Sequence, residues 1–221
     1  MSNTSEANGA GYDRTVIPGS TETPAPGRPP VTSVAELEHV ALELFTKHGF
    51  EETTVDQIAE SAGIGRRTFF RYFRSKNDVA WGDFDNQLRG FADAFDAVPR
   101  SVPLAAALHA CILEFNDFPQ EELPWLRRRM TLLLGVPALQ AHSTLRYQAW
   151  RDVVAAFVAR RRGEEAAALV PQVTAHCALG TALSAYEAWL AGDAGLRDLM
   201  DRALRAWLSG LPQQTGGSGR R

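Results

Sequence analysis

Residues 53–76 read TTVDQIAESAGIGRRTFFRYFRSK, and this pattern predicts a helix, a tight turn and a second helix. Thr54 and Gln57 have the spacing of a capping box, in which each side chain bonds a backbone N–H at the start of a helix. Apolar residues then recur at three- and four-residue steps and give the first helix one core-facing side: Val55, Ile58, Ala59 and Ala62. Gly63 follows, and glycine ends helices readily because it adopts the left-handed backbone conformation without strain.

The second helix begins near Gly65 and carries positive charge on its predicted outer side. At about 100° per residue, Phe69 and Phe73 fall on one side, while Arg67 and Arg71 point nearly opposite. The chain has a net charge of −3, yet five basic residues and no acidic one lie in this helix and just after it: Arg66, Arg67, Arg71, Arg74 and Lys76. This is the layout of a helix-turn-helix that binds double-stranded DNA, in which arginines can donate hydrogen bonds to guanine and basic residues can neutralise phosphates. A solvated surface with no partner is the alternative.

Another capping-box spacing, Ser75 with Asp78, predicts that a further helix begins directly after the basic segment. Aromatic and apolar residues recur at helical steps as far as Ala97, so we expect one continuous helix over 75–97: Trp81, Phe84, Leu88, Phe91 and Phe95. Lys76 would stand in its first turn, where a cation is disfavoured by the helix dipole and a nearby phosphate would offset the cost. Such a helix would link the DNA-binding segment mechanically to the C-terminal part of the chain.

The segment before residue 53 completes a predicted three-helix domain over residues 33–76. Ser33 with Glu36 is a capping box, and an apolar stripe then runs to Gly49: Leu37, Val40, Ala41, Leu44 and Phe45. Residues 1–32 are rich in Gly, Pro, Ser and Thr, so we expect a disordered extension without a secretory signal. Arg28 either reaches a DNA minor groove from there or belongs to a solvated linker.

Residues 41–76, ALELFTKHGFEETTVDQIAESAGIGRRTFFRYFRSK, resemble the DNA-binding domain of the tetracycline-repressor (TetR) family of bacterial transcription regulators. The resemblance implies phosphate contacts by Thr54 and Lys76, and base contacts by Arg66, Arg67 and Thr68. Two positions depart from the family pattern: Gly65 stands where serine is common, and Phe70 where a phosphate-binding tyrosine is common. Tyr72, at a position often held by histidine, would replace part of that contact. The expected DNA-binding set is Thr54, Gly65, Arg66, Arg67, Thr68, Phe70, Arg71, Tyr72 and Lys76.

Three further stretches resemble the TetR-type regulators associated with mycofactocin gene clusters in actinobacteria. They are RRTFFRYFRSKNDVAWGDFD (66–85), EELPWLRRRM (121–130) and LQAHSTLRYQAW (139–150), and the resemblance covers most of residues 28–209. It implies a regulator of genes for a peptide-derived redox cofactor, with a long-chain acyl-CoA as the effector.

The rest of the chain keeps a helical period, and the predicted fold class is therefore all-α. We expect a helical effector-binding and dimerisation domain over 77–211, followed by a flexible tail over 212–221. After the helix over 75–97, its helices are predicted near 103–117, 121–134, 137–162, 166–191 and 195–209. The segment 166–191 is very apolar, but Pro171, Gln172, His176 and Glu187 interrupt it, so it is expected to be a buried helix rather than a membrane span.

The last helix has an apolar stripe that suits a four-helix interface between two copies of the chain, as in the TetR family. The stripe consists of Leu196, Leu199, Met200, Ala203, Leu204, Trp207 and Leu208. We therefore expect a homodimer and a roughly palindromic operator.

Aromatic and polar residues among these helices are candidates for an effector pocket, although most aromatic residues at helical spacing simply belong to the core. The expected ligand-binding set is Phe84, Phe91, His109, Phe115, Trp125, Met130, Trp150, His176 and Tyr186. Trp81, Phe157 and Trp189 are further candidates. The arginine triplets 127–129 and 160–162 either meet coenzyme A phosphates or form a wet surface.

Composition and motifs argue against other classes of protein. With 221 residues, of which 45% are hydrophobic, the chain is long enough to bury a core. Cys111 and Cys177 are isolated, so we expect no disulfide, no metal and a reducing cytoplasm. The sequence has no Gly-rich phosphate loop, nucleophile elbow or metal spacing, which indicates neither an enzyme nor a bound cofactor. The alternative function is a small-molecule carrier or sensor that acts through a protein partner without binding DNA.

Overall fold

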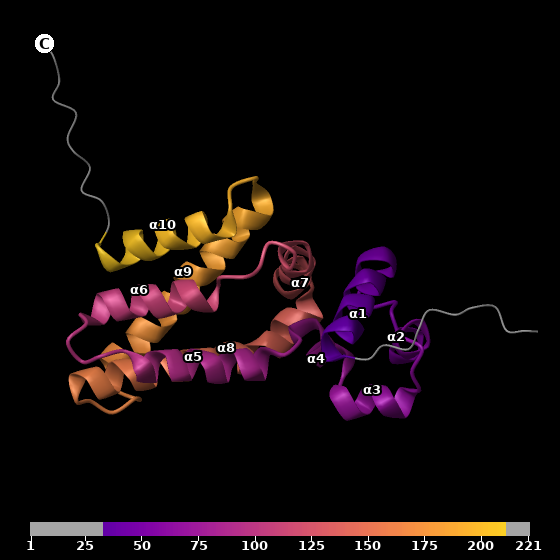
Figure 1. The fold of residues 1–221 in the computed structure, drawn as a ribbon, viewed down its shortest axis with the longest axis horizontal. Helices are drawn as coiled ribbons and strands as arrows, with labels where there is room; N and C mark the ends of the chain where they lie inside the picture. Colours follow the sequence, from indigo (N-terminus) through magenta and orange to yellow (C-terminus); the bar gives the residue numbers. More distant parts are fainter. Residues whose placement is uncertain (1–32, 211–221) are drawn as a thin grey trace, which may run out of the picture.

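The computed structural model describes residues 33–210, which fold into ten α-helices without a strand (Figure 1). The all-α prediction is therefore confirmed. The extension at 1–32 with Arg28, and the tail at 212–221, lie outside the described residues.

Four helices form one end of the elongated molecule (Figure 1): α1 (Val34–His48), α2 (Val55–Ser61), α3 (Arg66–Tyr72) and α4 (Lys76–Trp81). Both capping boxes at the start of α1 and α2 are present, as predicted from Ser33–Glu36 and Thr54–Gln57. Side-chain oxygens there satisfy N–H groups that have no partner within the helix. Phe69 and Phe73 are buried in the core, and α3 packs against α2.

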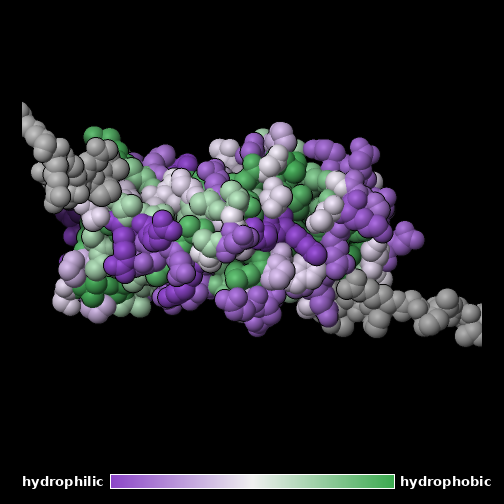
Figure 2. Space-filling model, turned by 90° about the horizontal axis from the view of Figure 1, so that it is seen from above, coloured by the Kyte–Doolittle hydropathy of each residue, from purple (hydrophilic) through white to green (hydrophobic). Residues whose placement is uncertain are grey.

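Six helices form the remainder of the described residues: α5 (Phe84–Ala97), α6 (Leu104–Phe115), α7 (Leu123–Gly135), α8 (Pro137–Arg162), α9 (Leu169–Ala191) and α10 (Leu196–Leu208). Most of the predicted bounds are within three residues of these. In the core, α9 packs against both α8 and α10, and α7 touches α1 and α4 at the junction with the first four helices. Hydrophilic residues dominate the surface at the α1–α3 end, while hydrophobic residues appear in patches elsewhere (Figure 2).

The prediction of one continuous helix over 75–97 is wrong. The chain breaks at Gly82, whose φ of 60° and ψ of −144° belong to a region that is almost restricted to glycine. A side chain at this position would collide with the carboxylate of Glu38 and lie 2.6 and 2.8 Å from the two terminal nitrogens of Arg129. The break therefore makes room for an ion pair between α1 and α7.

The prediction that segment 166–191 is a buried helix is also wrong for the single chain. One side of α9 is in contact with α8 and α10, but Leu169 is 76% exposed and Val173 is 50% exposed. Cys177 lies on this exposed side, whereas Cys111 is buried. Within residues 33–210, no helix is both long enough and apolar enough to cross a bilayer.

Candidate nucleic-acid interface and ligand pocket

The outer face of α3 is held in place by the hydrophobic residues beneath it. Phe69 is completely buried, and its ring lies 5.9 Å from that of Phe73. Opposite these rings, Arg67 and Arg71 are exposed. Arg67 makes neither an ion pair nor a hydrogen bond with any of residues 33–210. Its guanidinium is therefore free to meet a partner.

The other arginines of α3 make weak contacts at the surface. Arg66 forms an ion pair with Asp56 at 2.7 Å, with both side chains more than half exposed, and its guanidinium lies over the ring of Phe70. Arg71 donates to the hydroxyl of Tyr72 at 3.2 Å and lies over that ring. Exposed contacts of this kind contribute little to stability, so these cations can exchange partners at small cost.

Three more predicted DNA-binding residues lie near or at the start of α3. Thr54 accepts the N–H of Gln57 and caps α2. Gly65 starts α3 without a side-chain cap, and Thr68 is half-buried in its first turn.

Lys76 is the predicted DNA-binding residue with the strongest contacts inside the protein. Its ammonium donates to the carbonyls of Phe50 at 2.6 Å and Glu51 at 3.2 Å, and it lies 4.4 Å from the centre of the Phe50 ring. It therefore fastens α4 to the loop between α1 and α2.

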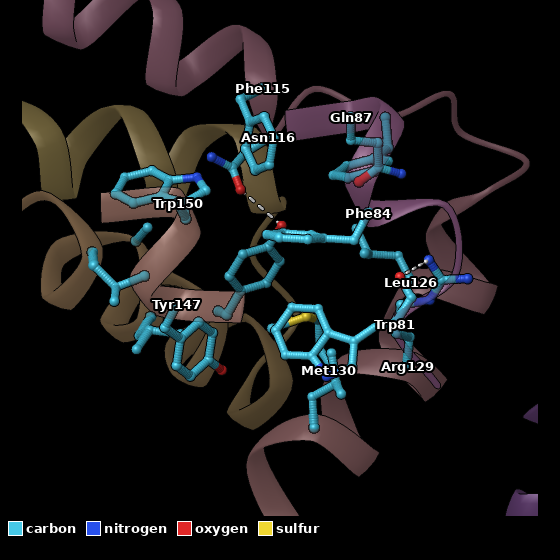
Figure 3. Close-up of a pocket in the computed structure, with 16 residues that line it drawn as sticks. Trp81, Phe84, Gln87, Phe115, Asn116, Leu126, Arg129, Met130, Tyr147 and Trp150 are labelled. Carbon is cyan, nitrogen blue, oxygen red and sulfur yellow. Dashed lines mark hydrogen bonds between the residues drawn. The ribbon is translucent and has the colours of Figure 1, made fainter. Parts of the chain in front are cut away.

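A pocket lies between α4, α5, α7, α8, α9 and the end of α6 (Figure 3). Mostly apolar residues line it: Trp81, Phe84, Gln87, Phe115, Asn116, Phe118, Leu126, Arg129, Met130, Leu133, Tyr147, Trp150, Leu179, Ala182, Leu183 and Tyr186.

One polar pair fixes the wall of this pocket. The hydroxyl of Tyr186 donates to the side-chain oxygen of Asn116 at 2.8 Å (dashed line at Asn116 in Figure 3). The Asn116 amide donates to the carbonyl of Ile112 at 2.7 Å. Complete burial raises the pKa of Tyr186 far above its usual value, so this hydroxyl stays neutral and orients Asn116.

Five of the nine predicted ligand-binding residues line this pocket: Phe84, Phe115, Met130, Trp150 and Tyr186. Phe91 packs behind its wall, with its ring 5.2 Å from Trp150. His109 is bonded to Asp201 at 2.8 Å. Trp125 stacks on His39, with ring centres 4.0 Å apart, and His176 is exposed on α9. Helical periodicity did not distinguish residues that line the pocket from residues of the core.

The arginine triplets mostly contact the protein itself. Arg160 pairs with Asp96, Arg161 donates to three carbonyls of the loop after α5, and Arg162 pairs with Glu164. Arg127 and Arg128 lie over Trp189 and Trp125, respectively. Arg129 alone of the six lines the pocket, and it pairs with Glu38 of α1 at 2.7 Å.

The described residues contain no group of three or more His, Cys, Asp or Glu side chains placed to hold a metal ion.

Two family models match the chain. Residues 39–80 match the model described as bacterial regulatory proteins, tetR family, and residues 102–212 match the MftR C-terminal domain. A candidate mycofactocin biosynthesis transcriptional regulator, MftR of Mycobacterium tuberculosis, is 46% identical over 164 residues, which is 74% of this chain and 83% of that protein. The regulator TcmR of Streptomyces glaucescens is 34% identical over 134 residues, 58% of this chain and 59% of TcmR.

Solved structures share the fold at low sequence identity. FadR of Thermus thermophilus in complex with lauroyl-CoA matches with a TM-score of 0.56 and 20% identity, over 86% of this chain and all of that one. FadR of Bacillus subtilis in complex with stearoyl-CoA matches with a TM-score of 0.56 and 15% identity, over 81% of this chain and all of that one.

Proposed function

The chain belongs to the TetR family of bacterial transcription regulators, and we propose that it is a repressor whose affinity for operator DNA falls when an apolar effector enters the pocket. The observation that carries the DNA-binding part is the exposed cationic face of α3 opposite the buried Phe69 and Phe73. A protein that only carries a small molecule has no need for arginines fixed on that face.

The proposed DNA contacts fall into two groups. Arg66, Arg67 and Thr68 face bases in the major groove, where a guanidinium donates to O6 and N7 of guanine. Arg71, the residues at the ends of the motif and the two exposed rings contact the sugar-phosphate backbone: Thr54, Gly65, Phe70, Tyr72 and Lys76. Backbone contacts position the protein, and base contacts give it sequence preference.

A homodimer is part of the proposal, and α9 supports it. Its exposed residues up to Ala188 lie along one side of the helix: Leu169, Val170, Val173, His176, Cys177, Gly180, Ser184, Glu187 and Ala188. The apolar stripe of α10 is largely packed within its own chain, with Leu196, Met200 and Leu204 buried. We therefore place α9 at the centre of the interface. A two-fold dimer would bind a palindromic operator with half-sites about one helical turn apart.

The proposed effector is a long-chain acyl-CoA, and the proposed target is a mycofactocin biosynthesis gene cluster. The proposed location of the protein is the cytoplasm. The apolar lining of the pocket and the FadR structures support the effector, and the similarity to the Mycobacterium tuberculosis protein supports the target. Release of DNA then requires an effector that binds the released conformation more tightly, with a coupling free energy of roughly 1–3 kcal/mol.

The test is a DNA mobility shift on the region upstream of the chain's own gene, with and without a series of acyl-CoA thioesters. We expect Arg67→Ala to relax base preference. Lys76→Gln should weaken binding to all sequences and flatten its salt dependence. A melting curve is needed for Lys76→Gln because this side chain also holds the α1–α2 loop. Unchanged operator affinity in both variants, or no shift by the native protein, would contradict the proposal.

A further inference from the structure

Arg129 belongs to two neighbouring hollows at once. One is the pocket, and the other is a cleft between α1 and α7, which we call the α1–α7 cleft and which is lined by Glu38 and His39 of α1 and by Trp125 and Arg129 of α7 among others. Gln87, Phe118, Leu126 and Arg129 line both hollows. The pocket is therefore adjacent to α1, the first helix of the DNA-binding end.

At this junction Arg129 holds α1 through a buried ion pair. Its guanidinium lies 2.7 Å from the carboxylate of Glu38, with 15% of the Arg129 side chain and 8% of the Glu38 side chain exposed. A terminal nitrogen of Arg129 also donates to the carbonyl of Trp81 at 3.5 Å, across the break at Gly82 (Figure 3). Burial raises the pKa of Glu38 even though Arg129 opposes this change. The carboxylate thus depends on Arg129 for its charge.

Three residues that line the pocket carry a buried hydrogen-bond donor with no acceptor within the described part of the chain: Trp81, Arg129 and Tyr147. Arg129 and Trp81 are also in direct contact through the hydrogen bond described above. The Nε of Arg129 and the indole Nε1 of Trp81 are buried without a hydrogen bond within the described part of the chain. Both residues line the pocket, and Trp81 is only 5% exposed. Buried donors without partners are rare in native proteins. Their presence beside an apolar cavity points to a ligand that supplies oxygen acceptors.

We propose that Arg129 and Trp81 bind the oxygen head group of an acyl effector, the carboxylate of a free acid or the carbonyl of a thioester, and that this draws Arg129 away from Glu38. The acyl chain lies among the aromatic residues of the pocket. Glu38 then loses its partner, and the contact of α1 with α7 loosens. This inference rests on the proposed function, and it assigns to Arg129 the step that couples effector binding to the DNA-binding end.

Ligand titrations of the full-length protein test the head-group contact in the absence of DNA. Laurate and lauroyl-CoA serve as probes, and quenching of tryptophan fluorescence reports binding because Trp81 and Trp150 line the pocket. We expect Glu38→Gln to bind the preferred probe at least threefold more tightly, because Arg129 is no longer held by a carboxylate. The double variant Glu38→Gln/Arg129→Met removes both charges together, so no buried charge is left unpaired. It should bind at least tenfold more weakly.

Arg128→Gln is the matched control, because Arg128 is the exposed neighbour of Arg129 on α7. It should bind both probes like the native protein. Preference for laurate or for lauroyl-CoA identifies the source of the head group. Native affinity in the double variant, or no binding of either probe to the native protein, overturns the inference.

Mobility shifts with the same variants test the link to DNA. Glu38→Gln should release operator DNA at a lower probe concentration than the native protein, and the double variant should release it only at a higher one. Equal release concentrations in all three proteins would overturn the link. If no protein, native included, shifts DNA while the titrations behave as expected, the proposed function fails and the head-group contact stands.

Discussion

Gly82 occupies a position where both the backbone conformation and the surrounding side chains require glycine. Its backbone conformation disfavours any side chain, and a Cβ atom would meet the Glu38–Arg129 pair. We expect Gly82→Ala to lower the free energy of unfolding by about 1–3 kcal/mol. Gly90→Ala is the control, because Gly90 lies within α5 with open space around it. That substitution should raise stability by roughly 0.5–1 kcal/mol. Urea denaturation measures both, and equal effects would contradict this account of Gly82.

Asp56 limits the charge that α3 offers to a phosphate. Its carboxylate pairs with Arg66 at the surface, so it also repels an approaching phosphate. We expect Asp56→Asn to change stability by less than about 1 kcal/mol, because exposed ion pairs contribute little. DNA affinity should rise, and the salt dependence should steepen by about one phosphate contact. Binding isotherms at several salt concentrations test this, and lower affinity for all DNA sequences would show that Asp56 helps to bind.

The sequence predicts single residues well where the signal is local. The capping boxes at Ser33 and Thr54 were predicted because their partners lie three residues away. The partners of Arg129 and Lys76 lie 91 and 26 residues away, so no local pattern indicated them. A long basic side chain looks the same in a sequence whether it meets solvent, a carbonyl or a buried carboxylate.

Among the elements, α4 and α8 are joined by an ion cluster centred on Asp78. Arg146 lies 3.1 Å and His142 3.3 Å from its carboxylate, and Ser75 donates to it at 2.7 Å. Partial burial alone would raise the pKa of Asp78, but the hydrogen bonds from Ser75 and Arg146 and the nearby charge of His142 lower it below the usual 3.8. Because the folded state holds this proton less tightly than the unfolded state, the cluster stabilises the fold above about pH 4.

A pH series tests the Asp78 cluster. We expect the native protein to melt at a higher temperature than Asp78→Asn at pH 6. The difference should shrink as the pH falls below 3.8 and through the lowered pKa of Asp78. The variant itself is the reference at each pH, so other titrating groups cancel. A difference that is the same at pH 6 and pH 3 would contradict the assignment.

The helices themselves were largely predictable, and the exceptions have physical causes. The bounds of α8 agree with the prediction because Pro137 and Gly163 mark its ends. The break between α4 and α5 was missed because Trp81 and Phe84 keep a helical spacing across it. Both rings face the pocket from different helices, so spacing alone does not show that the backbone is continuous.

At the scale of the whole molecule, the exposed side of α9 is the surface at which we propose that two chains meet. The apolar composition of segment 166–191 predicted a buried helix. In the single chain, however, Leu169 and Val173 are exposed to solvent. Such exposure is what we expect of a helix that a second copy of the chain would cover. The periodicity of a helix does not show whether the residues that cover it belong to the same chain or to a second copy. The fold class was thus predictable from the sequence, whereas the surface that would cover α9 was not.

A charge introduced on this side of α9 tests the dimer. Val173→Glu places a carboxylate on the exposed side of α9, within the proposed interface, where desolvating an unpaired charge is costly. We expect this variant to be monomeric at micromolar concentration by light scattering, and to bind a palindromic operator more weakly than the native dimer does. Leu145→Glu is the control, because Leu145 is 76% exposed on α8 and lies outside the exposed side of α9; it should leave the dimer intact. A native protein that is already monomeric, or a dimer that persists in Val173→Glu, would remove α9 from the interface. The first outcome would also mean that the two-fold operator has no two-fold protein to match it.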